Sequence, residues 1–430
     1  MGRVLQETNL NADVLRAWER RYGLPNPQRT PGGHRLYSDY DIEVIKWLLV
    51  RQSEGLSISN AADLWKSQIA SGQDPLLEKQ VSLVMPDVFG TASPSQLDHL
   101  REEWVNACLN FDSSRAFAAA SQAFVLYPVE TACDKILREG ICEIGHLWYE
   151  GKISVQQEHF ATALAIQRVG TLISTSPEPT RPQTILIGCP PGEWHSFPAL
   201  FLTLLLRRRG FKVVYLDANV PVEQMGQTIA AVHPDLIILT AQQLSTAVSL
   251  QQVALLLGGV NIPLGYGGLV FNRIPSLRTK IPASFLGEDL MQSIETIELL
   301  LQKPTEINLF EPPTPEYLHI AALYTEHQSR IETVLGQLLA GLHLNIEPLN
   351  RINTWMSAAL SAALKLGNLD FLQEDLNWIG DLITFRQITT ANLKSYLESY
   401  RQAVEQALGE NGTLLTDWFE LTIASYSEPD

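Results

Sequence analysis

The chain has 430 residues, of which 45% are hydrophobic and 18% are charged, and it carries a formal net charge of −16 at pH 7. This length exceeds what a single hydrophobic core supports, so we expect two to four domains. The acidic balance argues against a protein coated with nucleic acid along its whole length. No apolar run approaches the length of a membrane span and no basic-then-apolar leader is visible, so we expect a soluble, cytoplasmic protein with no membrane partner.

The predicted elements divide the chain into four domains, giving a multidomain α and α/β protein. Residues 1–72 are predicted to hold a short helix, a turn, a second helix, a glycine-rich hairpin and a third helix. Helical periodicity indicates a bundle over 95–175. Short apolar runs alternate with amphipathic helices over 182–302, which predicts a doubly wound parallel sheet. Residues 315–425 are again predicted to be helical. The five predicted strands are 184–188, 212–216, 235–240, 262–266 and 283–287.

The four cysteines do not form a CxxC pair. Their spacing predicts neither a disulfide framework nor a zinc cluster. We therefore expect four buried, reduced thiols, namely Cys108, Cys133, Cys142 and Cys189.

Arginines concentrate near the N-terminus, on one predicted helix and one predicted hairpin. Asn11 can cap a helix over 12–21, whose apolar spacing leaves Arg16 and Arg20 pointing outward. In the hairpin over 29–37, two adjacent glycines supply a tight turn. Scattered surface arginines are usually only solvated, but this clustering suits contact with phosphates and a groove edge. The helix residues predicted to face inward are Val14, Leu15 and Trp18.

The string LRAWERRYGLPNPQRTPGGHRLYSDYDIEVIKWL over 15–48 resembles the winged-helix DNA-binding domain of the MerR family. The resemblance implies that the helix over 12–21 enters the major groove, that the wing over 29–37 tracks the backbone, and that the protein binds a double-stranded operator as a homodimer or homotetramer. The DNA contacts that it implies are Arg16, Arg20, Arg21, Tyr22, Arg29, His34 and Arg35.

The loop after the first predicted strand reads CPPGEWHSFP and carries a carboxylate and an imidazole two residues apart, Glu193 and His195. In doubly wound sheets, ligands bind at the carboxyl ends of the strands. A nearby carboxylate orients an imidazole and raises its basicity. A single loop histidine is more often an ordinary surface residue, and no second ligand lies nearby, which disfavours zinc. One axial histidine does suit a metal whose other positions are filled by a macrocycle.

The string GEWHSFPALFLTLLLRRRGFKVVYLDANVP over 192–221, with TAQ at 240–242 and GYGG at 265–268, is similar to a cobalamin-binding domain. The resemblance implies that His195 is the lower axial ligand of cobalt and that Glu193 supports it. It also implies that the nucleotide tail enters between a strand end and a glycine turn. The residues that would contact the tail are Thr240, Gly267 and Gly268.

The preceding helical segment contains Trp148 and, ten residues later, Glu158 and His159. Ser154 and Gln157 form a predicted capping box for the helix that follows. A histidine on such a helix face is usually a satisfied core residue. The W-x9-E-H pattern, however, resembles the cap helices of light-responsive cobalamin regulators, where these residues line the upper face of the cofactor. That helix face is predicted to hold Val155, His159, Thr162, Ala163 and Ile166.

The resemblance extends over about residues 1–302 and implies a mechanism. Adenosylcobalamin would lie between the helical cap and the sheet domain, and the loaded protein would assemble into a DNA-binding oligomer. Light would break the cobalt–carbon bond, the cap would move, and the oligomer would dissociate. The implied protein is therefore a transcriptional regulator and photoreceptor, not an enzyme.

Other interpretations stay open. A metal- or drug-sensing regulator of the same DNA-binding family would need grouped thiols or a ligand cavity. A cobalamin-dependent enzyme or corrinoid carrier would need a substrate site or partner barrel. In a third interpretation, the fold no longer binds cobalamin and a protein partner controls the switch. Pro198 and Gln242, which stand where glycine and leucine are usual, would be signs of that loss.

Residues 315–425 lie outside the resemblance, and we expect a helical bundle with Trp355, Trp378 and Trp418 in its core.

Overall fold

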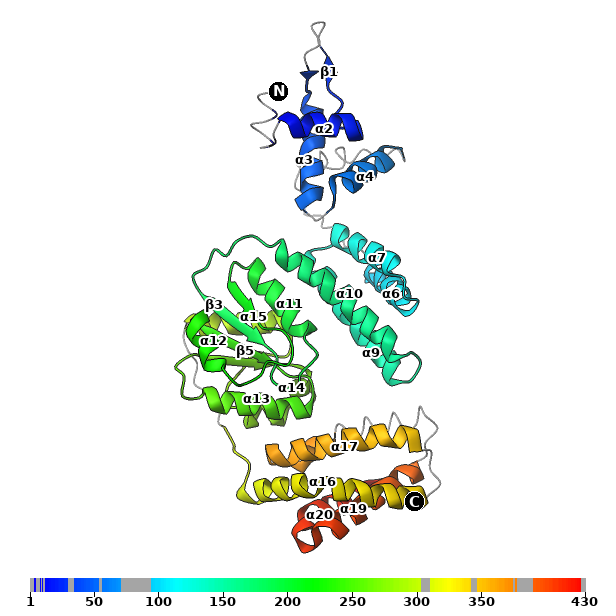
Figure 1. Ribbon diagram of the computed structural model, residues 1–430, viewed down its shortest axis with the longest axis vertical. Coiled ribbons are helices and arrows are strands. Elements are labelled where there is room, and N and C mark those ends of the chain that lie inside the picture. The colour runs from blue at the N-terminus through cyan, green and yellow to red at the C-terminus, as the bar shows by residue number, and fades with distance from the viewer. Residues whose placement is uncertain are drawn as a thin grey trace. The chain divides into compact units, whose positions relative to one another are not determined.

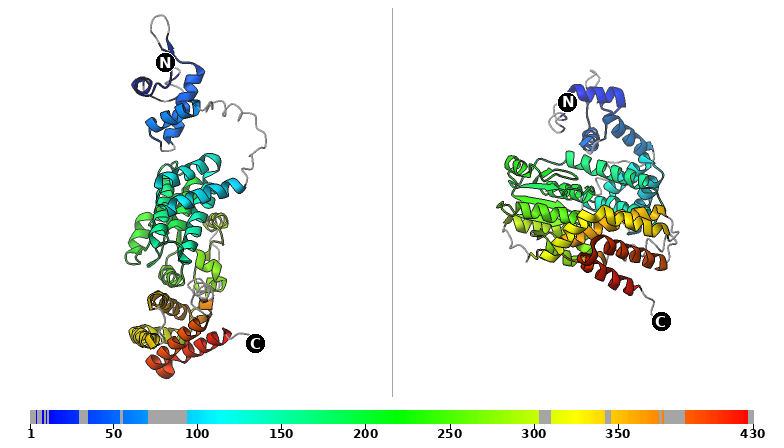
Figure 2. Two further views of the ribbon diagram at one scale, coloured as in Figure 1. Left: turned by 90° about the vertical axis from the view of Figure 1, so that its right-hand side faces the viewer. Right: turned by 60° about the horizontal axis from the view of Figure 1, so that its bottom comes forward.

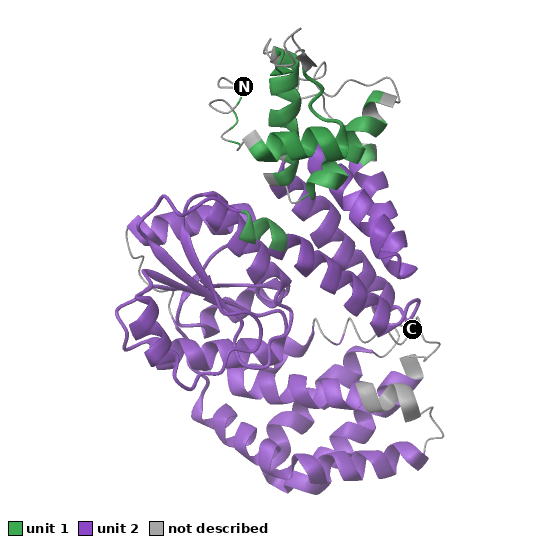
Figure 3. Cartoon of the chain, turned by 45° about the horizontal axis from the view of Figure 1, so that its top comes forward, with its two compact units in different colours: residues 1–96, 171–175 green, residues 97–170, 176–430 purple. Residues whose placement is uncertain are grey.

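The computed structural model divides into two compact units, shown in two colours in Figure 3. One unit holds residues 1–96 with 171–175, and the other holds 97–170 with 176–430. Each unit is described by itself below. The described residues are 4, 8, 10, 12–29, 35–53, 56–70, 94–302, 310–341, 346–373, 376 and 390–426.

The first unit holds a short antiparallel hairpin and helices packed around an apolar cluster. Its elements are α2 (Ala12–Tyr22), β1 (Gln28–Arg29), β2 (Arg35–Leu36), α3 (Asp39–Ser53) and α4 (Ile58–Ala70). Leu15 and Trp18 are buried in the cluster as predicted, but Val14 is 38% exposed, so its inward assignment was wrong. Two helices follow the hairpin where the sequence predicted one. Asn11, the predicted cap, lies outside the described residues.

The helical segment between residues 94 and 174 is a bundle that lies mostly in the second unit, with residues 94–96 and 171–174 of its outer helices belonging to the first. Its helices are α6 (Pro94–Leu109), α7 (Ser113–Leu126), α8 (Val129–Ala132), the π-helical turn η2 (Cys133–Arg138), α9 (Glu139–Tyr149) and α10 (Val155–Ser174). The capping box before α10 is confirmed: the Ser154 N–H donates to Gln157 Oε1 at 2.8 Å, and the Gln157 N–H donates back to Ser154 Oγ at 3.4 Å. Ala161, Leu164 and Ala165 form the buried side of α10.

The sheet of the second unit has five parallel strands in the order β4-β3-β5-β6-β7, so the predicted doubly wound sheet is confirmed. The strands are β3 (Thr184–Gly188), β4 (Lys212–Tyr215), β5 (Leu236–Thr240), β6 (Leu264–Gly267) and β7 (Ser284–Phe285). Helices cover both faces of the sheet in Figure 1 and Figure 2. These are α11 (Phe197–Arg208), α12 (Met225–Val232), α13 (Leu244–Leu257), α14 (Leu269–Arg273) and α15 (Leu290–Gln302). Strands β3 and β5 are buried throughout, as continuous apolar runs in a parallel sheet should be.

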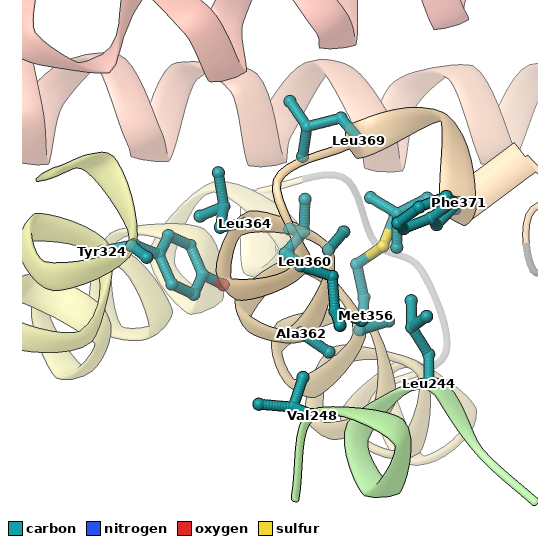
Figure 4. Close-up of a cluster of buried hydrophobic side chains, with 14 of the residues drawn as sticks. Leu244, Val248, Tyr324, Met356, Leu360, Ala362, Leu364, Leu369 and Phe371 are labelled. Atoms are coloured by element: carbon teal, nitrogen blue, oxygen red, sulfur yellow. The ribbon is translucent and has the colours of Figure 1, made fainter. Parts of the chain in front are cut away.

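The remaining helices pack against the sheet domain through α13. They are α16 (Pro315–Gly341), α17 (Ile346–Leu366), the 3₁₀ turn η4 (Leu369–Phe371), α19 (Thr390–Leu408) and α20 (Thr413–Ser425). One buried apolar cluster includes Leu244 and Val248 of α13 together with Met356 and Leu360 of α17, and Figure 4 shows these side chains meeting. Trp355 and Trp418 pack at the edge of this cluster, while Trp378 lies outside the described residues.

Three of the four cysteines are buried, and the fourth, Cys142 on α9, is exposed, so the expectation of four buried thiols was wrong for that residue. The apolar character of a thiol predicts burial, but α9 has a solvent face and Cys142 lies on it. Across the part of the chain that the structure describes, no helix has the length and apolarity needed to cross a membrane.

Candidate functional site

Helix α2 presents its arginines to solvent. Arg16, Arg20 and Arg21 are exposed, and the latter two lie in the last turn. Arg16 Nη1 lies 3.1 Å from Asp13 Oδ1, an exposed pair that costs little to exchange for a phosphate. Tyr22, in contrast, is half-buried against the core of the unit. The helix ends at Tyr22, and the Gly23 that follows has a φ of +69°, which suits glycine, before the chain turns toward the hairpin.

Arg35 ties the hairpin to α2. Its Nε donates to Glu19 Oε2 at 2.6 Å, and both side chains are mostly covered. This ion pair fixes the hairpin against the helix, so Arg35 positions the hairpin in addition to contributing a positive charge. For Arg29 the structure describes only the backbone, in β1, and His34 lies outside the described residues.

The carboxyl edge of the sheet is organised by Glu193, whose side chain is fully buried. Its Oε1 accepts from the backbone N–H of His195 at 2.9 Å and lies 2.7 Å from His195 Nδ1. Its Oε2 accepts from the Gln242 N–H at 2.6 Å and from the Thr246 hydroxyl at 2.7 Å. One carboxylate thus joins the loops that follow β3 and β5, the neighbouring strands at which the strand order reverses and where such sheets bind ligands.

These bonds set the protonation of the pair. Burial opposes ionisation of Glu193, but hydrogen bonds from His195, Thr246 and two backbone N–H groups outweigh it and hold its pKa below the usual value. The hydrogen bond to Glu193 raises the pKa of His195 against the opposing effect of burial. Because Nδ1 faces the carboxylate, Nε2 is the ring nitrogen left for a ligand, and the His195 side chain is exposed.

The loop after β4 supports the same site from the other side. Asn219 Oδ1 accepts from the Gly192 N–H at 2.8 Å, and the Asn219 N–H donates to the Glu193 carbonyl at 2.8 Å. Asn219 holds a φ of +51°, a conformation that asparagine tolerates better than most residues. Sequence reasoning missed both Asn219 and Thr246. The signal for Asn219 is its place in the loop three residues after a predicted strand.

The predicted tail residues lie at the ends of β5 and β6. Thr240 is buried, with its hydroxyl 3.5 Å from Cys189 Sγ. Gly268 has a φ of +130°, and a Cβ there would lie 1.8 Å from the Ala241 carbonyl oxygen, so only glycine fits. A Cβ on Gly267 would meet nothing within 4 Å. The turn therefore comes close to the β5 loop at one glycine and is open at the other.

The cap residues are exposed on one side of their helices. Trp148 is 42% exposed in the last turn of α9, and His159 is exposed on α10 with Nδ1 2.6 Å from Glu158 Oε2. The face that carries His159 is thus not a core face, which overturns the ordinary reading of a buried, satisfied histidine. The charge of Glu158 adds, after the larger effect of Glu193, to the raised pKa of His195.

The described residues fit a metal whose other ligands belong to a macrocycle. Among them no group of three His, Cys, Asp or Glu side chains could hold a metal ion, whereas His195 offers one ring nitrogen backed by a carboxylate. Gln242 Oε1 accepts from the Leu269 N–H, but its Nε2 is buried without a hydrogen-bond partner within the described ranges. A free donor and the open space at Gly267 suit a bound cobalamin tail.

Comparison with known families gives three matches along the chain. Residues 1–68 match the MerR HTH family regulatory proteins, and residues 100–173 and 183–289 each match a B12 binding domain.

Two curated relatives come from Myxococcus xanthus. The chain is 32% identical over 231 residues to the HTH-type transcriptional repressor CarH, covering 53% of this chain and 73% of the relative. It is 28% identical over 240 residues to the HTH-type transcriptional repressor CarA, covering 55% and 74%. Among solved structures, a monomethylamine corrinoid protein of Methanosarcina barkeri is 17% identical with a TM-score of 0.40, covering 49% of this chain and 99% of that one. The chain therefore belongs to the MerR-type helix-turn-helix transcriptional regulators that carry B12-binding domains, the family of CarH.

Proposed function

We propose that this cobalamin-controlled DNA-binding regulator takes adenosylcobalamin, with His195 as the lower axial ligand, and responds to light. The observation that carries the proposal is the buried Glu193 carboxylate, which faces Nδ1 of His195 and leaves Nε2 for a ligand at the point where the strand order reverses. The charge of the Glu158 carboxylate in the cap contributes to the raised pKa of that imidazole, which supports a site bounded by both cap and sheet.

Each remaining residue then has a role set by its place. Thr240, Gly267 and Gly268 would admit the nucleotide tail, with the free Gln242 Nε2 as a donor to it. Trp148, Glu158 and His159 would cover the upper side of the site from the cap. Bound adenosylcobalamin supplies a cobalt–carbon bond that visible light breaks. The exposed indole of Trp148 would pack against the upper ligand, and the contact between cap and sheet would be the switched element.

We further infer that the exposed arginines of α2 bind double-stranded operator DNA and that the protein acts as a homodimer or homotetramer. The contacts would come from Arg16, Arg20, Arg21, Tyr22, Arg29, His34 and Arg35. A regulator acts where the chromosome is, so we infer a cytoplasmic location and no catalytic role. The four predicted domains at 1–72, 95–175, 182–302 and 315–425 would then serve as DNA reader, cap, cofactor domain and a helical domain whose role this proposal leaves open.

The proposal is tested on the full-length protein loaded with adenosylcobalamin in the dark. We expect retention of the cofactor on gel filtration, an absorbance change under green light, and a loss of oligomer and of operator binding after illumination. His195→Ala should abolish the lower-ligand spectrum and weaken retention, while the exposed His319→Ala should leave both unchanged. Equal cobalamin retention in the two variants would remove the assigned role of His195. Normal operator binding by the protein without cobalamin would instead favour a switch that is controlled by a protein partner.

The DNA-reading part has its own test. Arg20→Gln should weaken binding to all sequences and reduce the salt-dependence slope by about 1, because one phosphate contact is lost. Lys66→Gln on α4, also exposed, is the matched control and should change neither quantity. Equal effects of the two substitutions would show that α2 is not the DNA-binding face.

A further inference from the structure

A polar groove of about 750 Å³ lies between the sheet domain and the C-terminal helices, away from the Glu193 site. Helix α13 contributes Ser245, Ser249 and Gln252 to one wall. Helix α16 contributes Gln328 and Glu332 to another. The volume falls in the range of small-molecule sites, but hydroxyl and amide groups dominate its walls where such sites are usually apolar. The groove therefore suits a ligand with many hydrogen-bonding groups.

Helix α17 runs along the groove and sets its length. Asn353, Ser357, Ser361 and Lys365 are spaced four residues apart, so they lie on one face of the helix, and all four line the groove. At 1.5 Å per residue, the stretch from the first to the last spans about 18 Å. The groove is therefore long enough for an extended ligand.

One end of the groove collects acceptors. The buried Ser357 hydroxyl donates to Glu332 Oε1 at 3.2 Å, and Gln328 Nε2 donates to the same oxygen at 2.9 Å. These bonds hold the Glu332 carboxylate over the groove. Asn353 Oδ1 is buried and accepts no hydrogen bond from any described residue. A carboxylate and a free carbonyl oxygen at one end call for a cationic group with N–H donors.

The other end carries a cation. Lys365 is half-buried, and no described carboxylate forms an ion pair with it. A second groove of about 760 Å³ adjoins at Lys365 and is lined by Pro313, Leu318 and Leu255, the last two of which are exposed. This end therefore suits an anionic group with an apolar side chain beside it. The exposed Glu326 also borders the second groove, which disfavours a further negative charge there.

We propose that the groove binds a short peptide with free ends, its ammonium at Glu332 and Asn353 and its carboxylate at Lys365. An extended chain advances 3.3–3.6 Å per residue, so about five residues span the roughly 18 Å available. The serine and glutamine side chains of the walls pair with the peptide N–H and C=O groups, which need partners when covered. The apolar groove beside Lys365 selects an apolar residue at the C-terminus of the peptide.

The test uses full-length protein without cofactor and the probe Ala-Ala-Ala-Ala-Leu in isothermal titration calorimetry. We expect binding that weakens about tenfold when the carboxylate is amidated and about tenfold when the amine is acetylated, since each change removes one charge pair. Replacing the terminal Leu by Glu should weaken binding at least as much.

Two variants assign the ends. In Lys365→Gln, amidation of the peptide should no longer change its affinity. In Glu332→Gln, acetylation of the peptide should no longer change its affinity. Lys394→Gln, on α19 and outside the groove, should behave as the wild type. Absence of measurable heat, equal affinity for free and capped peptides, or an amidation effect that persists in Lys365→Gln would overturn the proposal. Circular dichroism of each variant separates lost binding from lost folding.

Discussion

The Glu193 carboxylate connects histidine orientation to the geometry of the sheet. One oxygen accepts a hydrogen bond from the backbone N–H of His195 and lies against its ring nitrogen Nδ1. The other oxygen accepts from the hydroxyl of Thr246, in the first turn of α13. A fully buried carboxylate stays ionised here because four hydrogen bonds replace its water. The imidazole is thus aimed by a group that is itself fixed by two strands.

Glu193→Gln should lower the unfolding free energy of the unloaded protein by about 2–3 kcal/mol, because an amide NH₂ would replace an oxygen that accepts two bonds. Urea unfolding measures this difference. Glu223→Gln, at an exposed position, is the matched control and should stay within about 0.5 kcal/mol of the wild type. A loss equal to that of the control would mean that the Glu193 bonds contribute nothing net.

The same difference should depend on pH. The Glu193 pKa is lowered by folding, so its contribution is present above the unfolded value of about 4.3 and is lost as the pH falls through the folded pKa. The His195 pKa is raised, so its contribution is present below about 6.5 and is lost as the pH rises through the folded pKa. The stability gap between wild type and Glu193→Gln should therefore be widest between about pH 4.5 and 6.5. A gap that grows toward pH 9 would contradict the pairing.

The turn that follows β6 shows how one element combines a packing demand with an open space. Gly268 meets the Ala241 carbonyl, which lies in the loop after β5, so the two loops can approach only without a side chain there. Gly267, one residue earlier, has no such neighbour. Gly268 is therefore needed by the fold, whereas Gly267 is needed only if a ligand passes over it.

Gly268→Ala should destabilise the protein by at least about 2 kcal/mol, through both the clash and the unfavourable φ. Gly267→Ala should change stability by less than about 1 kcal/mol, yet weaken cobalamin retention if the tail crosses this turn. Urea unfolding and retention on gel filtration measure the two effects. Equal loss of stability in both variants, or full retention in Gly267→Ala, would contradict the division of roles.

The two central strands, β3 and β5, were predictable because each is a short buried run, and burial of both faces of a parallel sheet produces that pattern directly. The Glu193–His195 pair was also visible, since the two residues are local in sequence. Thr246 was not, because it lies 53 residues from Glu193 and only the pairing of β3 with β5 brings them together. Val14 was misassigned because it borders the apolar stripe of α2, where a helical period does not decide exposure.

The C-terminal helices share their core with the cofactor domain. Buried residues of β5, β6 and α13 belong to the same cluster as those of α16, α17, α19 and α20. The first turn of α13 also donates a hydrogen bond to Glu193 through Thr246, while its following turns pack on α17 and line the polar groove. Because a contiguous packed core transmits strain, we expect the helical domain and the cofactor site to be mechanically linked.

Met356→Ala should therefore destabilise both regions together, by about 2–5 kcal/mol, because it opens a cavity in the shared cluster. Met356 is fully buried on α17, whereas Met291 on α15 is 55% exposed, so Met291→Ala is a matched control with little expected effect. Hydrogen exchange by mass spectrometry should show loss of protection in β6 as well as in α17, and calorimetry should show one transition for both. If α17 alone lost protection while β6 kept it, the two would be independent folding units, and the C-terminal helices would be an appendage that cannot communicate with the cofactor site through α13.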